Sequence, residues 1–166
     1  MNSKTKPLLL VVGVIVTAAL AAVIAMVALG GGKETATKAE YRAIVVTAAD
    51  RVDYALGRLS KAETLPELLD RMDEAARSIE SAAGDLDEMR APAELESEHA
   101  KLEDALRKLS NDVQGTADQA RVPGFEDLLF GAHGLDWDSW DDANAALEAM
   151  QKKGLEVALL SRQTTS

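Results

Sequence analysis

The chain has 166 residues and a formal net charge of −10, and it contains no cysteine, which excludes disulfides, thiolate metal sites and cysteine catalysis. Lys4 and Lys6 are the basic residues before position 33, so residues 33–166 hold 28 acidic and 16 basic residues and carry a net charge of −12. Such a surface repels phosphate backbones and anionic lipid headgroups, so we expect no nucleic-acid partner.

Residues 8–29, LLLVVGVIVTAALAAVIAMVAL, contain no charged side chain. As a helix they span about 33 Å at about 1.5 Å per residue, enough for a hydrocarbon core of about 30 Å. A cleaved signal peptide is the alternative, but its apolar region covers roughly 7–15 residues, and AMVALGGGKE offers only poor cleavage sites. We therefore expect an uncleaved transmembrane anchor and a single-pass protein of the cell membrane.

Basic residues flank both ends of this run, so their count alone does not decide its orientation. A short basic tail before the first apolar helix usually stays inside, and long domains are translocated largely regardless of their charge. We expect a cytoplasmic tail at residues 1–7, a linker at residues 30–37 and an extracytoplasmic domain after it.

Residues 38–161 are expected to form an all-α, antiparallel up-down bundle of about four helices. The first apolar stripe advances in steps of three and four residues, which is typical of a helix with one buried face. Its members are Tyr41, Ile44, Val45, Ala48, Val52, Ala55, Leu56 and Leu59.

A second helix is predicted to begin after Thr64, a good N-cap, with Glu67 as its capping-box partner and Pro66 in the first turn. Pro92 ends this helix and suits the first turn of a third. The short connection predicts antiparallel neighbours. The two stripes comprise Leu65, Leu68, Met72, Ala75, Ile79, Ala82, Leu86 and Met89, and then Leu95, His99, Leu102, Leu106, Leu109, Val113 and Ala117.

A fourth helix is predicted from about residue 137, with Asp136 as its N-cap and Gly154 as the glycine that ends it. Residues 155–160, LEVALL, are expected either to resume a helix or to lie extended. We favour the helix, because the sequence has no other strand pattern with which they could pair. Residues 162–166 should fray. The stripe of this helix is Trp140, Ala143, Leu147 and Met150.

A string of aspartates at the start of this helix has two interpretations. An EF-hand loop that begins at Asp136 has Trp140 at its fifth position and Leu147 where the bidentate glutamate belongs. Aspartates in a first turn instead complement the helix dipole, so we favour a helix start over a cation site. The string is Asp136, Asp138, Asp141 and Asp142.

His99 interrupts the third apolar stripe. A buried pH sensor or a metal or haem ligand is one interpretation, because bundle cores often hold such sites. Glu96 and His99 give one Glu-x-x-His spacing, but the second helix has no histidine and His133 is the one other imidazole. We therefore expect no metal or cofactor, and interpret His99 as a buried polar residue bonded to a carboxylate or backbone group.

Four of the six aromatic residues fall between residues 125 and 140, namely Phe125, Phe130, Trp137 and Trp140. Burial of the stripe end beneath a loop is the simplest explanation. The alternatives are a surface for a protein partner, an apolar ligand pocket, and anchoring at the membrane interface.

Residues 91–113, APAELESEHAKLEDALRKLSNDV, carry the pattern P-x-x-L-x-x-x-H-x-x-L. This segment resembles a helix of uncharacterised membrane-tethered helical proteins of high-GC bacteria. The order of anchor and helical domain is also similar to chemoreceptor sensor domains, but neither a second transmembrane run nor a signalling module is visible here. The resemblance implies a tethered bundle and no particular activity.

The sequence contains no G-x-S-x-G, P-loop, H-E-x-x-H or G-x-G-x-x-G motif. We therefore expect a non-enzymatic, membrane-anchored bundle that acts as a binding, adaptor or accessory subunit through a protein partner or self-association. The alternative is a ligand-binding sensor-type domain with an apolar pocket near residues 125–140.

Overall fold

The computed structural model describes residues 35–123 and 137–161, which belong to one compact unit. They form an all-helical bundle, as the apolar stripes predict. Its α-helices are α2 (Lys38–Gly57), α3 (Leu65–Asp87), α4 (Glu96–Ala120) and α6 (Asp138–Lys152). A short 3-10 helix, η1 (Leu59–Lys61), follows α2, and a second, η2 (Ala93–Leu95), precedes α4.

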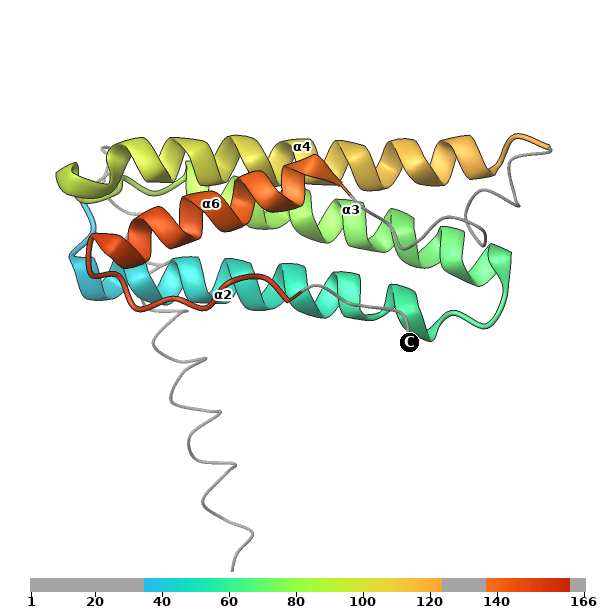
Figure 1. Ribbon diagram of the computed structural model, residues 1–166, viewed down its shortest axis with the longest axis horizontal. Helices are drawn as coiled ribbons and strands as arrows, with labels where there is room; N and C mark the ends of the chain where they lie inside the picture. The colour runs from blue at the N-terminus through green and yellow to red at the C-terminus, as the bar shows by residue number, and fades with distance from the viewer. Residues whose placement is uncertain (1–34, 124–136, 162–166) are drawn as a thin grey trace, which may run out of the picture. The chain divides into compact units, whose positions relative to one another are not determined.

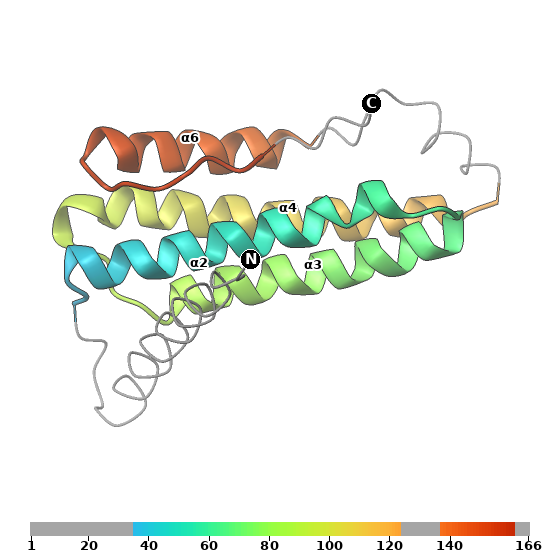
Figure 2. The same ribbon diagram turned by 90° about the horizontal axis from the view of Figure 1, so that it is seen from below.

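The helices alternate in direction along the chain (Figure 1). α3 packs against both α2 and α4, and α6 packs against the other side of α4, as Figure 2 also shows. Side-chain contacts near both ends of α6 hold it antiparallel to α4. Near its start, the indole Nε1 of Trp137 donates to Thr116 at 3.0 Å, and just past its end the Lys153 ammonium meets Glu98 at 2.5 Å.

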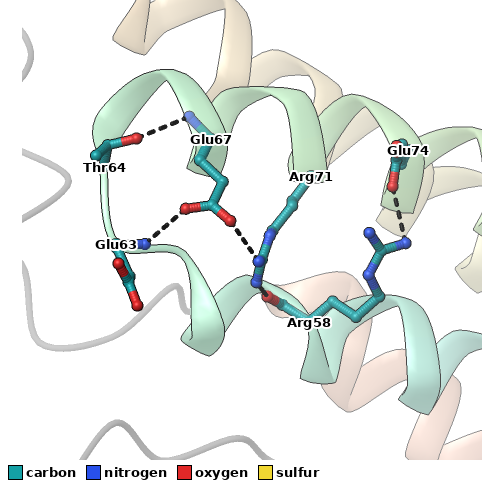
Figure 3. A network of polar contacts seen from close by, with 6 residues as sticks. All are labelled: Arg58, Glu63, Thr64, Glu67, Arg71 and Glu74. Atoms are coloured by element: carbon teal, nitrogen blue, oxygen red, sulfur yellow. Dashed lines mark hydrogen bonds and ion pairs between the residues drawn. The ribbon is translucent and has the colours of Figure 1, made fainter.

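The start of α3 has the predicted N-cap, but the predicted capping-box partner binds other groups. The backbone N–H of Glu67 donates to the Thr64 hydroxyl at 3.4 Å, so Thr64 is the N-cap of α3. The Glu67 carboxylate, however, accepts from the backbone N–H of Glu63 at 2.9 Å and from the Arg71 guanidinium (Figure 3). Because Arg71 also donates to the Arg58 carbonyl, this network ties the start of α3 to the end of α2.

Small residues let α3 and α4 approach closely along their shared core. The hydroxyl of buried Ser110 donates to the Ala76 carbonyl at 2.8 Å, so this polar group has a partner inside the core. Larger side chains fill the space on either side. The fully buried members include Met72, Ile79, Leu86, Leu106 and Leu109.

Gly154 ends α6 as predicted. Its φ of +79° lies in the left-handed region, which costs an L side chain about 1–2 kcal/mol. The N–H of Leu155 donates to the Met150 carbonyl at 3.0 Å and that of Gly154 to the Gln151 carbonyl at 2.8 Å, which is the Schellman pattern. Burial of both Leu155 and Met150 completes the motif.

Gly154→Ala is therefore expected to lower the free energy of unfolding by about 1–2 kcal/mol. Gly84, in the interior of α3, is the matched control because a Cβ built there meets no atom within 4 Å. Gly84→Ala should raise the free energy of unfolding by about 0.5–1 kcal/mol. Urea unfolding of both variants measures the difference, and equal effects would contradict the left-handed assignment.

Residues 155–161 are extended, so the prediction that LEVALL resumes a helix is wrong. This C-terminal segment runs in the same direction as α2 and opposite to α6 (Figure 1). Side chains take the place of a strand partner: the amide of Gln151 donates to the Val157 carbonyl at 2.7 Å, and Asn144 exchanges two hydrogen bonds with Leu160. The segment thus closes the bundle between α6 and α2.

The contacts with α2 agree with this geometry. The Arg42 side chain donates to the Glu156 carbonyl at 2.6 Å, and Asp53 accepts from the backbone N–H of Ser161 at 2.8 Å. Eleven residues of helix at 1.5 Å and five of extended chain at about 3.3 Å both span roughly 17 Å. The extended segment therefore covers the same length as α2 between these two contacts, and the two run side by side.

In the ranges that the structure describes, no helix combines the length and apolarity needed to cross a membrane. The predicted anchor at residues 8–29 lies outside these ranges, and so do the tail at residues 1–7, the linker up to residue 34 and the frayed residues 162–166. The anchor therefore remains a prediction from the sequence.

Candidate functional site

The two tryptophans lie where α6 begins against α4. Trp140 is 6 % exposed and belongs to the core, and its indole Nε1 is buried without a hydrogen-bond partner among the described residues. Trp137 is half-buried, packs against the core and is held by Thr116. The other two members of the predicted aromatic cluster, Phe125 and Phe130, fall outside the described residues.

Trp137, and not Asp136, occupies the N-cap position of α6. Its extended backbone (φ −116°, ψ 123°) presents a carbonyl that accepts from the N–H of Trp140 at 2.9 Å, and no side chain caps the helix. Asp138 and Asp141 lie in the first turn, as the dipole argument predicts. Across the ranges described, no group of three or more His, Asp or Glu is placed to hold a metal.

His99 lies at the opposite end of α4, half-buried against α2. Its Nδ1 lies 3.0 Å from the hydroxyl of Tyr41, a partner that the sequence prediction did not name. Tyr41 is 0 % exposed, and burial together with the nearby charge of Glu98 raises the pKa of its hydroxyl far above the ordinary value. The hydroxyl therefore stays neutral and remains available for this hydrogen bond.

An ion pair beside these two residues joins the ends of three helices. The Lys153 ammonium donates to the buried Glu98 carboxylate at 2.5 Å and to the Glu94 carbonyl at 2.7 Å, and Lys38 donates to the Lys153 carbonyl at 2.7 Å. The hydrogen bond from Lys153 holds the pKa of Glu98 below its ordinary value of 4.5. Because every polar group here has a partner inside the fold, the cluster fastens the helix ends.

The pKa of Glu98 predicts an acid-sensitive contribution to stability. A carboxylate whose folded pKa is lowered stabilises the protein above its unfolded pKa, and that stabilisation is lost as the pH falls through the folded value. The stability advantage of the wild type over Glu98→Gln should therefore be full above pH 4.5 and shrink below it. Glu94→Gln, which leaves the ion pair intact, is the control in denaturant titrations at each pH.

The outward side of α2 differs from the other helix surfaces. We call it the α2 outer strip, and its residues are Ala39, Ala43, Val46, Thr47, Asp50 and Tyr54. Val46 and Thr47 in its middle are half-buried, and Val46 also packs against the edge of the core. Tyr54 is 71 % exposed, the largest exposure among the large apolar side chains of the described residues. The Thr47 hydroxyl donates to the Ala43 carbonyl at 2.8 Å, so its hydrogen-bonding need is met within the helix. Asp50 is the one charged residue of the strip.

The strip was missed because the inward stripe from Tyr41 to Leu59 already accounts for one apolar face. A sequence signal was nevertheless present. Residues 43–49, AIVVTAA, are uncharged over almost two helical turns, which is long enough to place apolar side chains on every face. A helix that packs on the core with one face must leave the opposite apolar face exposed, unless another part of the protein or a binding partner covers it.

No family model, no curated protein and no solved structure matches this chain. No relative's activity can therefore be carried over to it.

Proposed function

We propose that the protein is a single-pass, membrane-anchored helical bundle that acts outside the cytoplasm by binding a protein chain, as an adaptor or accessory subunit. The observation that carries this proposal is the α2 outer strip. A helix surface with a single charged residue and an exposed tyrosine at its end is unusual on a chain with a net charge of −10. Protein interfaces combine such a charge-depleted centre with tyrosine, tryptophan and arginine anchors.

The surroundings of the strip also suit an interface. Charged residues border it on both sides, with Arg42 and Asp53 along one edge and Glu40 and Arg51 along the other. A polar border around an apolar centre is the usual anatomy of a protein interface.

α2 is held rigidly beneath this surface. Arg51 pairs with Asp85 and Arg58 pairs with Glu74, both on α3, while the C-terminal segment binds Asp53. A helix fixed in this way loses little further freedom when it binds, so less binding energy is spent on ordering it.

The anchor rests on the apolar run of residues 8–29 and agrees with the resemblance of residues 91–113 to membrane-tethered proteins. Single cysteines at Ser3 and Ser166 test the topology, because the chain has no other thiol. In intact cells we expect an impermeant thiol reagent to label the cysteine at position 166 and not that at position 3. The reverse pattern, or recovery of the protein in the soluble fraction, would contradict this part of the proposal.

Photo-cross-linking tests the binding function. Benzoylphenylalanine in place of Tyr54 keeps an aromatic ring on the strip, and the same residue in place of Asp104, exposed on α4, is the control. Irradiation of membranes should give a discrete protein adduct from position 54 and none from position 104. Absence of any adduct, or equal adducts from both positions, would overturn the proposal.

A ligand-binding sensor is the second candidate, and the buried indole Nε1 of Trp140 favours it. An N–H donor that is buried without a partner costs free energy, which a ligand carbonyl could recover. A thermal-shift screen of apolar ketones and amides should then find compounds that stabilise the wild type and not Trp140→Phe. Equal responses of the two proteins would reject this role.

A further inference from the structure

We propose that the partner of the α2 outer strip is a second copy of the same strip, bound antiparallel and centred between Val46 and Thr47. This inference rests on the proposed binding function and names its first occupant. A two-fold symmetric interface requires a surface that complements itself, so that each residue of one copy meets its counterpart twice. The α2 outer strip meets this requirement in both shape and charge.

The shape follows from the two ends of the strip. When two copies of α2 run antiparallel about the centre, Tyr54 of one copy lies opposite Ala39 of the other. The largest side chain of the strip thereby meets one of its smallest, and this contact occurs at both ends. Val46 and Thr47 face each other at the centre, where Thr47 has no unsatisfied hydroxyl because it is bonded to Ala43.

The charges on the borders match in the same register. Antiparallel helices bring equivalent borders together, so Arg42 of one copy approaches Asp53 of the other along one edge. Glu40 approaches Arg51 along the opposite edge. Within one copy Arg42 and Asp53 also contact the C-terminal segment, and Arg51 also pairs with Asp85. The attractions across the interface add to these contacts and favour the antiparallel direction of the pairing.

Asp50 distinguishes this arrangement from a parallel one. In a parallel, in-register pair the two Asp50 carboxylates would face each other across the interface, and such like-charge pairs are unfavourable. In the antiparallel pair each Asp50 lies opposite Ala43 of the second copy, next to its Arg42. The two carboxylates are then about 10 Å apart along the helix axis.

The acidic character of the domain restricts where a second copy can approach. The outward side of α3 exposes more acidic than basic residues, with Arg77 as its basic member, so two such surfaces would repel each other. Pairing of Glu74 and Asp85 with arginines of α2 reduces this repulsion without removing it. The exposed acidic residues of α3 are Asp70, Glu74, Glu80, Asp85 and Asp87, and exposed Glu88 follows as its C-cap. Since the α2 outer strip carries a single carboxylate, two like-charged copies meet less repulsion there than on the outward side of α3.

Cysteine cross-linking of the full chain in membranes tests the register, because the protein has no native thiol. The Val46→Cys variant should form a disulfide-linked dimer on mild oxidation, since the two positions adjoin the two-fold axis. Ala39→Cys alone and Tyr54→Cys alone should not, because equivalent positions are about 22 Å apart along the axis. Co-expressed Ala39→Cys and Tyr54→Cys chains should link to each other.

The control is Asp104→Cys on the exposed face of α4, which should remain monomeric. Self-linkage of the Ala39→Cys and Tyr54→Cys variants would show a parallel pair and overturn the proposal. Lack of linkage in every variant would overturn it as well. If the photo-cross-linker at position 54 then still captures a different protein, the binding function stands and only the identity of its partner is wrong.

Discussion

Leu155→Ala is expected to lower the free energy of unfolding by about 2–5 kcal/mol, although the residue lies only eleven positions before residue 166. Leu155 is 1 % exposed, and its removal leaves a cavity where the C-terminal segment enters the groove between α6 and α2. The change also removes the apolar contact with Met150 that accompanies the end of α6.

Leu159→Ala is the matched control, since Leu159 belongs to the same segment and is 37 % exposed. Its effect should stay within about 0.5 kcal/mol, as for most surface substitutions. Urea unfolding of both variants at equal concentration measures the contrast. Equal and small effects would mean that the segment does not close the bundle in solution.

Leu109→Ala is expected to have an effect of similar size, about 2–5 kcal/mol, because Leu109 is a fully buried residue of α4. The neighbouring Ser110 binds the Ala76 carbonyl of α3 and so holds this part of α4 in place, which leaves the helix little freedom to fill the cavity. The cost should therefore lie toward the upper end of that range.

Leu109→Met retains most of the volume and should cost less than about 1.5 kcal/mol. Chemical denaturation followed by circular dichroism distinguishes the two variants, and an unchanged m-value would show that only stability has changed. Similar costs for alanine and methionine would indicate that the α3–α4 core is loosely packed.

The local features of the fold could be predicted from the sequence because they depend on residues close together in the chain. The alternation of apolar residues defined α3 and α4, Thr64 marked the start of α3, and Gly154 marked the end of α6. In each case a short pattern is tied to one backbone conformation, so no knowledge of distant residues is needed.

Features that depend on distant residues were beyond this reasoning. The C-terminal segment was expected to be helical because no strand could pair with it, yet the side chains of Asn144 and Gln151 supply its hydrogen bonds. Tyr41 and His99 are likewise 58 positions apart, and nothing in their local sequence links them. Periodicity identifies the buried face of a helix and not the groups that meet it there.

The candidate site shows the same division. Clustering of aromatic residues drew attention to Trp137 and Trp140, and Trp140 proved to be part of the core. Apart from Asp50 and Tyr54, the α2 outer strip consists of small and uncharged residues, which resemble an ordinary helix in the sequence. Its significance depends on the contrast with the acidic surfaces around it, which the folded structure brings into view.

Labelling of the two tyrosines tests the central claim, that the α2 outer strip is covered by a protein in the membrane. Tyr54 is 71 % exposed and Tyr41 is 0 % exposed, so Tyr41 is an internal control within the same chain. Iodination should modify Tyr54 in the purified protein at high dilution, protect it in native membranes, and leave Tyr41 unmodified in both. Equal modification of Tyr54 in membranes and in dilute solution would contradict the account.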